Sequence, residues 1–236
     1  MHKLSIPQSV IDRVVARRGR EHIHDDLDPT KTALVVVDMQ NAFMLSGVAH
    51  SLVPMAKEIV PNINRLAQAV RDTGGAVVWI QTAYTDETTK SWSVYYDISR
   101  PEQNRKRAEA LAPGSKGYEL WETLEARKDD IFVEKKRFSA FIQGSSNIAD
   151  VLRARGIDTV LITGTVTGVC CESTARDAMM LNFKTVMVTD GNAAVTDEDH
   201  NASLAGFYLT FGDIMSTDML IGCLQRNARK GLAAAE

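Results

Sequence analysis

The sequence predicts an α/β protein with a mostly parallel, Rossmann-like, six-stranded sheet covered by helices on both faces, in three αβα layers. Short apolar runs alternate with longer amphipathic stretches along nearly the whole chain, a pattern typical of βαβ units. The apolar runs are continuous rather than alternating with polar residues, which indicates strands buried on both faces. With 236 residues, 44% of them hydrophobic, the chain can fill one such core.

The apolar runs predict six strands in the following order. We expect them at residues 33–38, 76–82, 131–134, 158–163, 185–189 and 211–216. The first strand ends in a carboxylate, Asp38, and the third is followed by a basic cluster that begins at Lys135. The fourth leads into a Gly/Thr-rich turn that reaches Cys170 where the next helix should begin.

Helices are predicted between these strands from apolar positions spaced by three and four residues. Ile59, Ile63, Leu66 and Val70 form one such face, and Gly74-Gly75 ends that helix. Further helices are expected at residues 147–155, before Gly156, and from Cys170 to about residue 181. Residues 101–107 are interpreted as the start of a surface helix.

One main domain is expected at residues 32–228, with an N-terminal arm or helix at 1–31 and a C-terminal tail at 229–236. The formal net charge of −3 provides no basic field for nucleic acid, and the basic run at residues 17–20 is interpreted as a solvated arm. No apolar run approaches membrane-spanning length and no signal peptide is recognised. We therefore predict a cytoplasmic protein without nucleic-acid or membrane partners.

Three residues whose side chains can take part in acid–base or nucleophilic catalysis lie at or after the ends of predicted strands, and this placement defines the candidate site. Asp38, Lys135 and Cys170 should meet at the carboxyl edge of the sheet, where parallel α/β proteins bind ligands. Taken singly, each has an ordinary interpretation: a turn-capping carboxylate, a solvated basic loop and a buried core cysteine. Their combination favours catalysis, because helix-end amides and a neighbouring cation can activate a thiol for attack on a carbonyl.

The residues around these positions resemble the cysteine hydrolases of the isochorismatase-like superfamily. The resemblance extends from about residue 32 to 223, with three motifs in the family's order. The motifs are Asp38-Met39-Gln40-Asn41-Ala42-Phe43, Lys135-Lys136-Arg137-Phe138-Ser139-Ala140-Phe141 and Gly164-Thr165-Val166-Thr167-Gly168-Val169-Cys170-Cys171-Glu172-Ser173-Thr174.

The resemblance implies a catalytic triad in which Cys170 is the nucleophile, Asp38 carries the proton and Lys135 is the orienting cation. It also implies a cis peptide bond between Thr165 and Val166, with the amides of Val166 and Cys170 forming an oxyanion hole. The reaction would cleave a C–N bond of a small amide or ureido compound through a thioester. A homodimer or homotetramer is implied as well.

The resemblance further implies that Asn41, Phe43, Tyr84 and Phe138 contact the substrate. The segments look most like ureidoacrylate amidohydrolase and its ureido-cleaving relatives, with two departures. Phe138 stands where that enzyme is expected to have tyrosine, and Thr82-Ala83-Tyr84 replaces Asn-Gly-Trp. The substrate therefore stays open among ureidoacrylate, biuret-like and other carbamoyl or carboxamide compounds.

Two other enzymes of the superfamily are weighed as alternatives. Nicotinamidases bind a metal through Asp and His ligands after the second strand, whereas this chain has no histidine between His50 and His200. We interpret these histidines, with His2, His22 and His24, as surface or loop residues, and predict neither a metal ion nor another cofactor. Isochorismatase itself lacks the nucleophilic cysteine, so Cys170 favours C–N hydrolysis.

The remaining features leave further alternatives. The segment 92–117 is interpreted as a lid over the substrate or as a subunit interface. Cys171 and Cys223 are predicted to be packing residues, and Met179-Met180 to fill the core. A catalytically silent scaffold is the non-enzymatic alternative, and a redox role for the adjacent cysteines is disfavoured because neighbouring cysteines bridge poorly.

Overall fold

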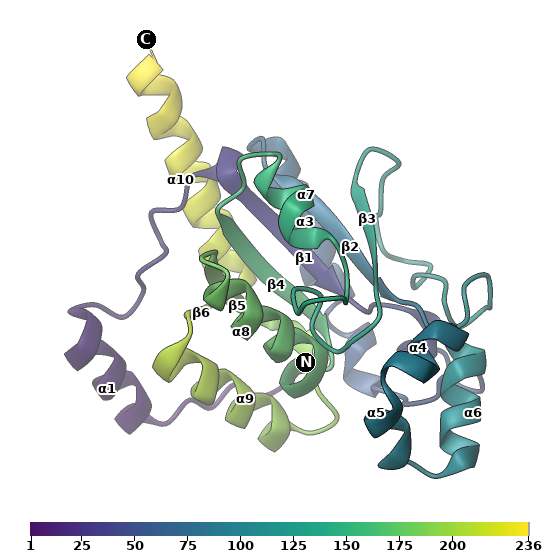
Figure 1. Ribbon diagram of the computed structural model, residues 1–236. Coiled ribbons are helices and arrows are strands. Elements are labelled where there is room, and N and C mark those ends of the chain that lie inside the picture. Colours follow the sequence, from purple (N-terminus) through teal and green to yellow (C-terminus); the bar gives the residue numbers. More distant parts are fainter. Residues whose placement is uncertain (236) are drawn as a thin grey trace.

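The computed structural model describes residues 1–235 and contains one central sheet whose strands all pair in parallel (Figure 1). The strand order is β3-β2-β1-β4-β5-β6. This confirms the predicted six-stranded, three-layer fold. The strands are β1 (Thr32–Val37), β2 (Ala76–Thr82), β3 (Ile131–Lys135), β4 (Thr159–Thr165), β5 (Lys184–Ala193) and β6 (Asp213–Met215).

The strand order reverses between β1 and β4, and this reversal locates the functional edge of the sheet. From β1 the chain proceeds through β2 to β3 on one side, and then returns to β4 on the other side of β1 before reaching β5 and β6. In open parallel sheets, a crevice forms at the carboxyl ends of the strands where the order reverses. The segments that follow β1, β3 and β4 therefore meet at this edge.

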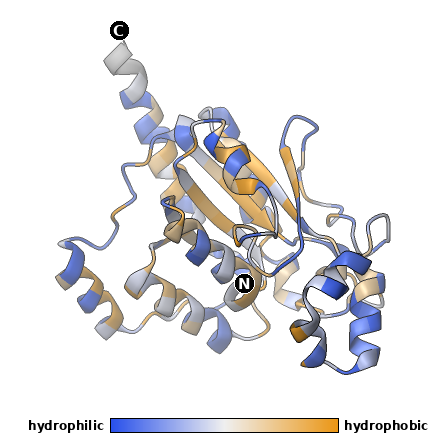
Figure 2. Cartoon of the chain, in the orientation of Figure 1, coloured by the Kyte–Doolittle hydropathy of each residue, from blue (hydrophilic) through white to orange (hydrophobic). Residues whose placement is uncertain are grey.

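Helices cover both faces of the sheet (Figure 1). On one face, α3 packs against α10 and the strands, and on the other α8 and α9 pack against β5. Side chains of β1 alternate between the two cores: Leu34 and Val36 lie in the first, whereas Val35 and Val37 lie in the second. Apolar residues accordingly concentrate along the strands in Figure 2. The layer helices are α1 (Gln8–Arg18), α3 (Val60–Asp72), α7 (Ile148–Arg153), α8 (Glu172–Met180), α9 (Asp197–Thr210) and α10 (Thr217–Ala235).

Short helices between β2 and β3 form an excursion beside the carboxyl edge of the sheet (Figure 1). They are α4 (Asp86–Ser91), α5 (Ser93–Asp97) and α6 (Pro101–Ala110), and α2 (Asn41–Met44) follows β1. The excursion is largely hydrophilic (Figure 2). The predicted surface helix at residues 101–107 is thus confirmed as the first part of α6. No helix in the described part of the chain combines the length and the apolar character that crossing a membrane requires.

Some predicted boundaries differ from the observed ones. Asp38 lies beyond the end of β1, and β5 continues to Ala193 through a register shift opposite β4. The predicted tail continues α10 as far as Ala235, while Glu236 lies outside the described residues. Sequence patterns place such ends poorly, because pairing with neighbouring strands and helices decides where an element stops.

Two packing predictions are wrong. Arg18, expected in a solvated arm, is largely buried and donates hydrogen bonds to the carbonyl oxygens of Tyr208 and Gly212. The side chains of Met179 and Met180 are exposed rather than in the core, because α8 turns its other face to the sheet. By contrast, Cys171 and Cys223 are buried as predicted.

His200 also departs from its prediction as a surface or loop residue. It lies inside α9, has no exposed area and contacts polar groups at both ring nitrogens. A buried neutral imidazole can be satisfied in this way, with one nitrogen donating a hydrogen bond and the other accepting one.

Candidate active site

The side chains of Asp38, Lys135 and Cys170 meet at the carboxyl edge of the sheet. Nζ of Lys135 lies 2.8 Å from Oδ2 of Asp38 and 3.6 Å from Sγ of Cys170. All three side chains are buried. The convergence that the sequence predicted for these three distant residues is therefore present in the structure.

Lys135 is held by four contacts at the end of β3. Besides Asp38 and Cys170, its ammonium donates hydrogen bonds to Oγ1 of Thr82 over 2.6 Å and to the carbonyl oxygen of Arg137 over 3.0 Å. A buried ammonium is stable only when such partners replace its water. These contacts fix the position of the charge between the carboxylate and the thiol.

Asp38 sits in a backbone conformation that aims its side chain away from the strand. Its φ is 53°, in the left-handed region, and its amide donates to the carbonyl oxygen of Ile80 over 3.0 Å. Thr82 donates its hydroxyl hydrogen to Oδ1 of the carboxylate over 2.9 Å. Non-glycine residues with positive φ are uncommon and concentrate at functional sites.

Gln40 connects the end of β2 to the segment that contains Asp38 through side-chain hydrogen bonds. Its side-chain oxygen accepts a hydrogen bond from the amide of Thr82 over 2.8 Å, and its side-chain nitrogen donates to the Thr82 carbonyl over 3.2 Å. The same nitrogen donates to the carbonyl oxygen of Tyr118 over 2.9 Å. The glutamine of the first motif is therefore a positioning residue for Thr82, buried behind the site.

The turn that carries Cys170 connects β4 to α8. The Thr165–Val166 peptide bond is cis, and residues Thr167–Cys171 form a single turn of π-helix, η3, before α8 begins at Glu172. Oγ1 of Thr167 lies 3.0 Å from Nδ1 of His200, which ties the turn to α9. Cys170 therefore precedes α8 rather than standing at its first residue.

Burial dominates the electrostatics of the thiol. It raises the pKa of Cys170 to about 12; the charge of Lys135 opposes this rise, and the charge of Asp38 adds to it. Burial by itself lowers the pKa of Lys135, but attraction from Asp38 and then Cys170 raises it overall. At neutral pH the cysteine is therefore a thiol beside an ammonium group.

A cavity of about 660 Å³ opens above Cys170. Three of the four predicted substrate contacts, Phe43, Tyr84 and Phe138, line it, as does Val166. Asn41 is not among the lining residues, and its side-chain amide donates to the carbonyl oxygen of Lys116 over 3.0 Å. The cavity thus joins the candidate nucleophile to residues from all three sequence motifs.

The excursion between β2 and β3 supplies one wall of this cavity. Tyr95 of α5 and Arg107 of α6 line it, and aromatic contacts connect Tyr84, Trp92, Tyr95 and Phe138. This contribution fits the lid interpretation of the segment 92–117. It leaves the interface interpretation open, since Val94 and Ile98 are largely exposed.

Several cavity residues were missed from the sequence. Thr82 ends β2 and obeys the strand-end rule that singled out Asp38 and Lys135, so that signal was available. His50 and Arg107 lie in a loop and a surface helix, where no periodicity points to a cavity. Their placement depends on how the excursion folds back over the sheet.

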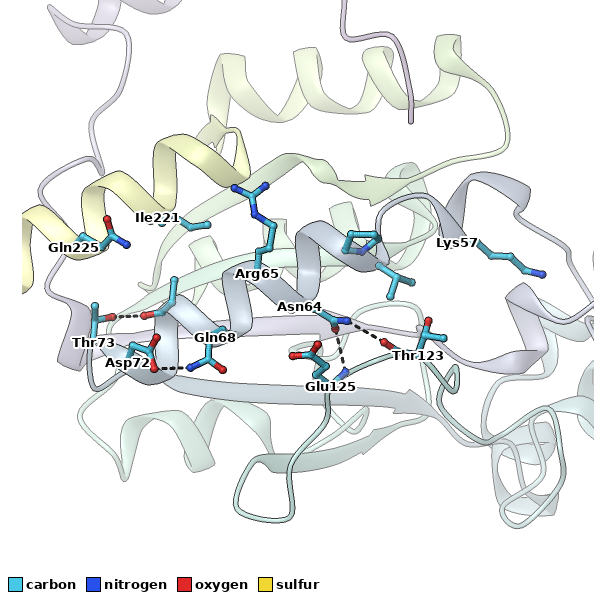
Figure 3. A pocket seen from close by; sticks show the side chains of 13 residues that line it. Lys57, Asn64, Arg65, Gln68, Asp72, Thr73, Thr123, Glu125, Ile221 and Gln225 are labelled. Atoms are coloured by element: carbon cyan, nitrogen blue, oxygen red, sulfur yellow. Dashed lines mark hydrogen bonds between the residues drawn. The ribbon is translucent and has the colours of Figure 1, made fainter.

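A second hollow, of about 810 Å³, lies apart from this site along α3 and α10. Figure 3 shows Asn64 and Gln68 of α3 in it, with Asn64 hydrogen-bonded to the backbone of Thr123 and Glu125. It shares no lining residue with the cavity above Cys170. Nor do the described residues include a group of three or more His, Cys, Asp or Glu side chains arranged to hold a metal ion.

Comparison with known proteins agrees with this architecture. Residues 32–219 match the isochorismatase domain model. The chain is 31% identical over 214 residues to a ureidoacrylate amidohydrolase of Acinetobacter baylyi, covering 85% of this chain and 86% of that protein. A cysteine hydrolase from Pseudomonas syringae pv. phaseolicola superposes with a TM-score of 0.75 and 29% identity, covering 86% of this chain and 96% of that one.

A second solved structure extends the comparison. N-carbamoylsarcosine amidase from Thermoplasma acidophilum superposes with a TM-score of 0.63 and 28% identity, covering 80% of this chain and 97% of that one. The domain match spans most of the chain and includes β1, β3 and the turn after β4, which carry the three converging side chains. The chain therefore belongs to the isochorismatase family.

Proposed function

We propose that this protein is a cysteine-dependent amidohydrolase that cleaves a C–N bond of a small ureido or carbamoyl compound. The observation that carries this proposal is the contact of Lys135 with both Asp38 and Cys170 at the end of a cavity. Similarity to a ureidoacrylate amidohydrolase and an N-carbamoylsarcosine amidase supports the substrate class. The same mechanism also applies to the C–N bond of simple carboxamides.

The first half of the reaction forms a thioester. Asp38 accepts the thiol proton as Sγ of Cys170 attacks the carbonyl carbon, and the carbonyl oxygen becomes an oxyanion. When the C–N bond breaks, the proton passes from Asp38 to the departing nitrogen, which leaves as ammonia or an amine. The raised pKa of Cys170 makes this proton acceptor necessary, since the resting group is a thiol.

The second half returns the enzyme to its resting state. A water molecule gives a proton to Asp38 and attacks the thioester carbon, which releases the acid and the sulfur. The proton on Asp38 then returns to Sγ. Lys135 remains charged throughout, and its proximity stabilises negative charge on the carboxylate or the sulfur as the proton moves between them.

The oxyanion is proposed to be stabilised by the backbone amides of Val166 and Cys170. Both residues line the cavity, and both belong to the turn after β4. Backbone donors in such a turn need no reorganisation when charge develops, and loss of one donor typically slows catalysis by roughly 100-fold or more. The reaction requires no metal ion or other cofactor.

We also propose a cytoplasmic location and a homodimeric or homotetrameric assembly. All three cysteines are free, which fits a reducing compartment. Val94 of α5 and Ile98, which follows this helix, are 71% and 76% exposed, and burial against a second copy would remove their apolar area from water. Light scattering of the purified protein measures the assembly directly.

The test of the proposed activity is ammonia release from a substrate panel. The panel contains ureidoacrylate, biuret, N-carbamoyl amino acids, nicotinamide and simple carboxamides, with Cys170→Ser assayed in parallel. We expect turnover of a ureido or carbamoyl compound that disappears in the variant. Mass spectrometry of the acid-quenched reaction should show an acyl group on the peptide containing Cys170.

The outcomes separate the alternatives. Preferred turnover of nicotinamide would favour a nicotinamidase activity, whereas turnover that persists in Cys170→Ser would exclude the thioester route. A folded protein without turnover of any compound and without a reactive Cys170 thiol would support the scaffold alternative. Circular dichroism of both proteins establishes that folding is equal.

A further inference from the structure

Helix α6 turns one face towards the cavity that contains Cys170. Gln103 and Arg107 are four positions apart, which places them on one side of the helix, and Arg100 is the residue just before its first turn. All three line the cavity. Arg105 of the same helix lies outside it, with a side chain that is 73% exposed and pairs with Glu109.

Arg107 is a cation whose neighbours leave its charge uncompensated. Its hydrogen-bond partners in the described part of the chain are neutral: Oδ1 of Asn104 at 2.9 Å and Oγ of Ser99 at 3.4 Å. Its Nε is buried and donates no hydrogen bond there, while the guanidinium lies 4.4 Å from the ring centroid of Tyr95. A buried, unused donor on a charged group favours a ligand that accepts from it.

The cavity as a whole is short of negative charge. Within the described residues its lining includes two arginines and no aspartate or glutamate. The charges of Asp38 and Lys135 beneath it oppose one another. His50, which also lines the cavity, is neutral at pH 7, because burial and then the charge of Arg107 lower its pKa to about 4. A cavity of this charge attracts anions.

We propose that Arg107 binds a carboxylate on the substrate, so that the enzyme acts on ureido or carbamoyl acids in preference to neutral ureas. This inference rests on the proposed amidohydrolase function and specifies its substrate class. A guanidinium can donate to both oxygens of a carboxylate, and Nε with one Nη forms a suitable pair of donors. Biuret or a carboxamide without an acid would leave Arg107 uncompensated.

The first test compares N-carbamoyl amino acids with their methyl esters, which keep the ureido group and lose the charge. We expect Arg107→Gln to lower kcat/KM for the acid by roughly 10- to 100-fold, as losing a hydrogen bond to a charged group does, mainly through KM. The ester should change little. Arg105→Gln is the matched control, and Arg107→Lys should recover part of the preference because it keeps the charge.

The second test does not depend on turnover. Iodoacetate and iodoacetamide both alkylate a cysteine: the sulfur forms a bond to the CH2 carbon, iodide departs and the thiol proton is released. The two reagents differ in charge, so the ratio of their rates at Cys170 measures the preference for an anion. We expect Arg107→Gln to lower this ratio several-fold, and Arg105→Gln to leave it unchanged.

The outcomes distinguish this inference from the proposal on which it rests. If acid and ester respond equally to Arg107→Gln and the alkylation ratio is unchanged, Arg107 does not bind a carboxylate, while the amidohydrolase function stands. Preference of the unmodified protein for biuret over every acid would overturn the inference as well. Absence of both turnover and Cys170 alkylation would overturn both proposals together.

Discussion

The hydroxyl of Thr82 donates to Oδ1 of Asp38 over 2.9 Å while it accepts from the ammonium of Lys135 over 2.6 Å. Thr82 therefore connects the carboxylate and the cation through one side chain at the end of β2. The three strand ends β1, β2 and β3 act as a unit, because each contributes one member of this hydrogen-bonded group. An isosteric change at Thr82 can interrupt the group without altering its charges.

Thr82→Val is expected to lower kcat by roughly 10- to 100-fold, with a smaller effect on KM. The valine removes a donor from Asp38 and an acceptor from Lys135, and a hydrogen bond to a charged group contributes about 1.5–3 kcal/mol. Steady-state kinetics on the compound identified by ammonia release measures the effect. Thr82→Ser keeps the hydroxyl and should retain most of the activity; equal rates for Val and Ser would contradict a role for the bridge.

The Cys170 thiol should stay protonated far above the usual range of cysteine. Burial raises its pKa to about 12, so the difference in absorbance at 240 nm between wild type and Cys170→Ser should show no thiolate through pH 10. Because the folded pKa exceeds the unfolded value of about 9, this group contributes stability below pH 9 that is lost as the pH rises towards 12. A thiolate signal at pH 7 would show that Lys135 outweighs burial.

Lys135→Met tests the opposing contribution of the cation. Removing its positive charge, which lowers the pKa of the thiol, should delay the appearance of the 240 nm signal to still higher pH. Lys136→Met is the matched control, since the Lys136 side chain is partly exposed and pairs with Glu87. An unchanged titration in Lys135→Met would contradict the electrostatic contact with Cys170.

The sequence could predict the site because strand ends are local signals. Asp38, Lys135 and Cys170 each follow an apolar run, and a parallel sheet brings such positions together whatever the intervening chain does. The cavity wall has no comparable signal. Whether Arg107 faces solvent or substrate depends on the aromatic packing of Tyr84, Trp92 and Tyr95, which is formed by contacts distant in sequence.

The sequence also did not predict, at several positions, which side chains are buried and how deeply. Met179 and Met180 suit a core by composition, yet the face of α8 that meets the sheet carries Thr174, Ala175 and Ala178. The rise in the Cys170 pKa likewise follows from the depth of the site, whereas the sequence indicated the helix-end amides and the cation that would lower this pKa. Helix faces and burial depth are set by the neighbours that an element meets.

Gly164, in β4, and Gly168, in the turn that carries Cys170, should respond very differently to alanine. At Gly164, with φ +120, an added Cβ would lie 2.0 Å from the carbonyl oxygen of Val37 on β1. We expect Gly164→Ala to lower the free energy of unfolding by more than about 3 kcal/mol, because backbone must move. Gly168→Ala, whose Cβ would meet nothing closer than 3.6 Å, should stay within about 0.5 kcal/mol of wild type. Urea unfolding measures both.

His200, in α9, connects the turn that carries Cys170 to β5. Its Nδ1 lies 3.0 Å from Oγ1 of Thr167, and its Nε2 lies 3.0 Å from the carbonyl oxygen of Thr189. In the neutral form, Nε2–H donates to Thr189 and Nδ1 accepts from Thr167. Protonation would place two donors where only one acceptor is available without reorienting the threonine hydroxyl.

This arrangement predicts a loss of stability in acid. Burial, and then the charge of His2, lower the pKa of His200 to about 4, so its contribution is present above pH 6.5 and is lost as the pH falls towards 4, by up to about 3 kcal/mol. Urea unfolding at pH 7 and 4.5 should therefore show a smaller acid loss in His200→Gln than in wild type. His22 supplies a control of opposite sign, because its hydrogen bond to Asp213 raises its pKa. The free energy of unfolding that His22→Gln loses relative to wild type should be larger at pH 4.5 than at pH 7. Equal acid sensitivity of His200→Gln and wild type would contradict a neutral, buried His200.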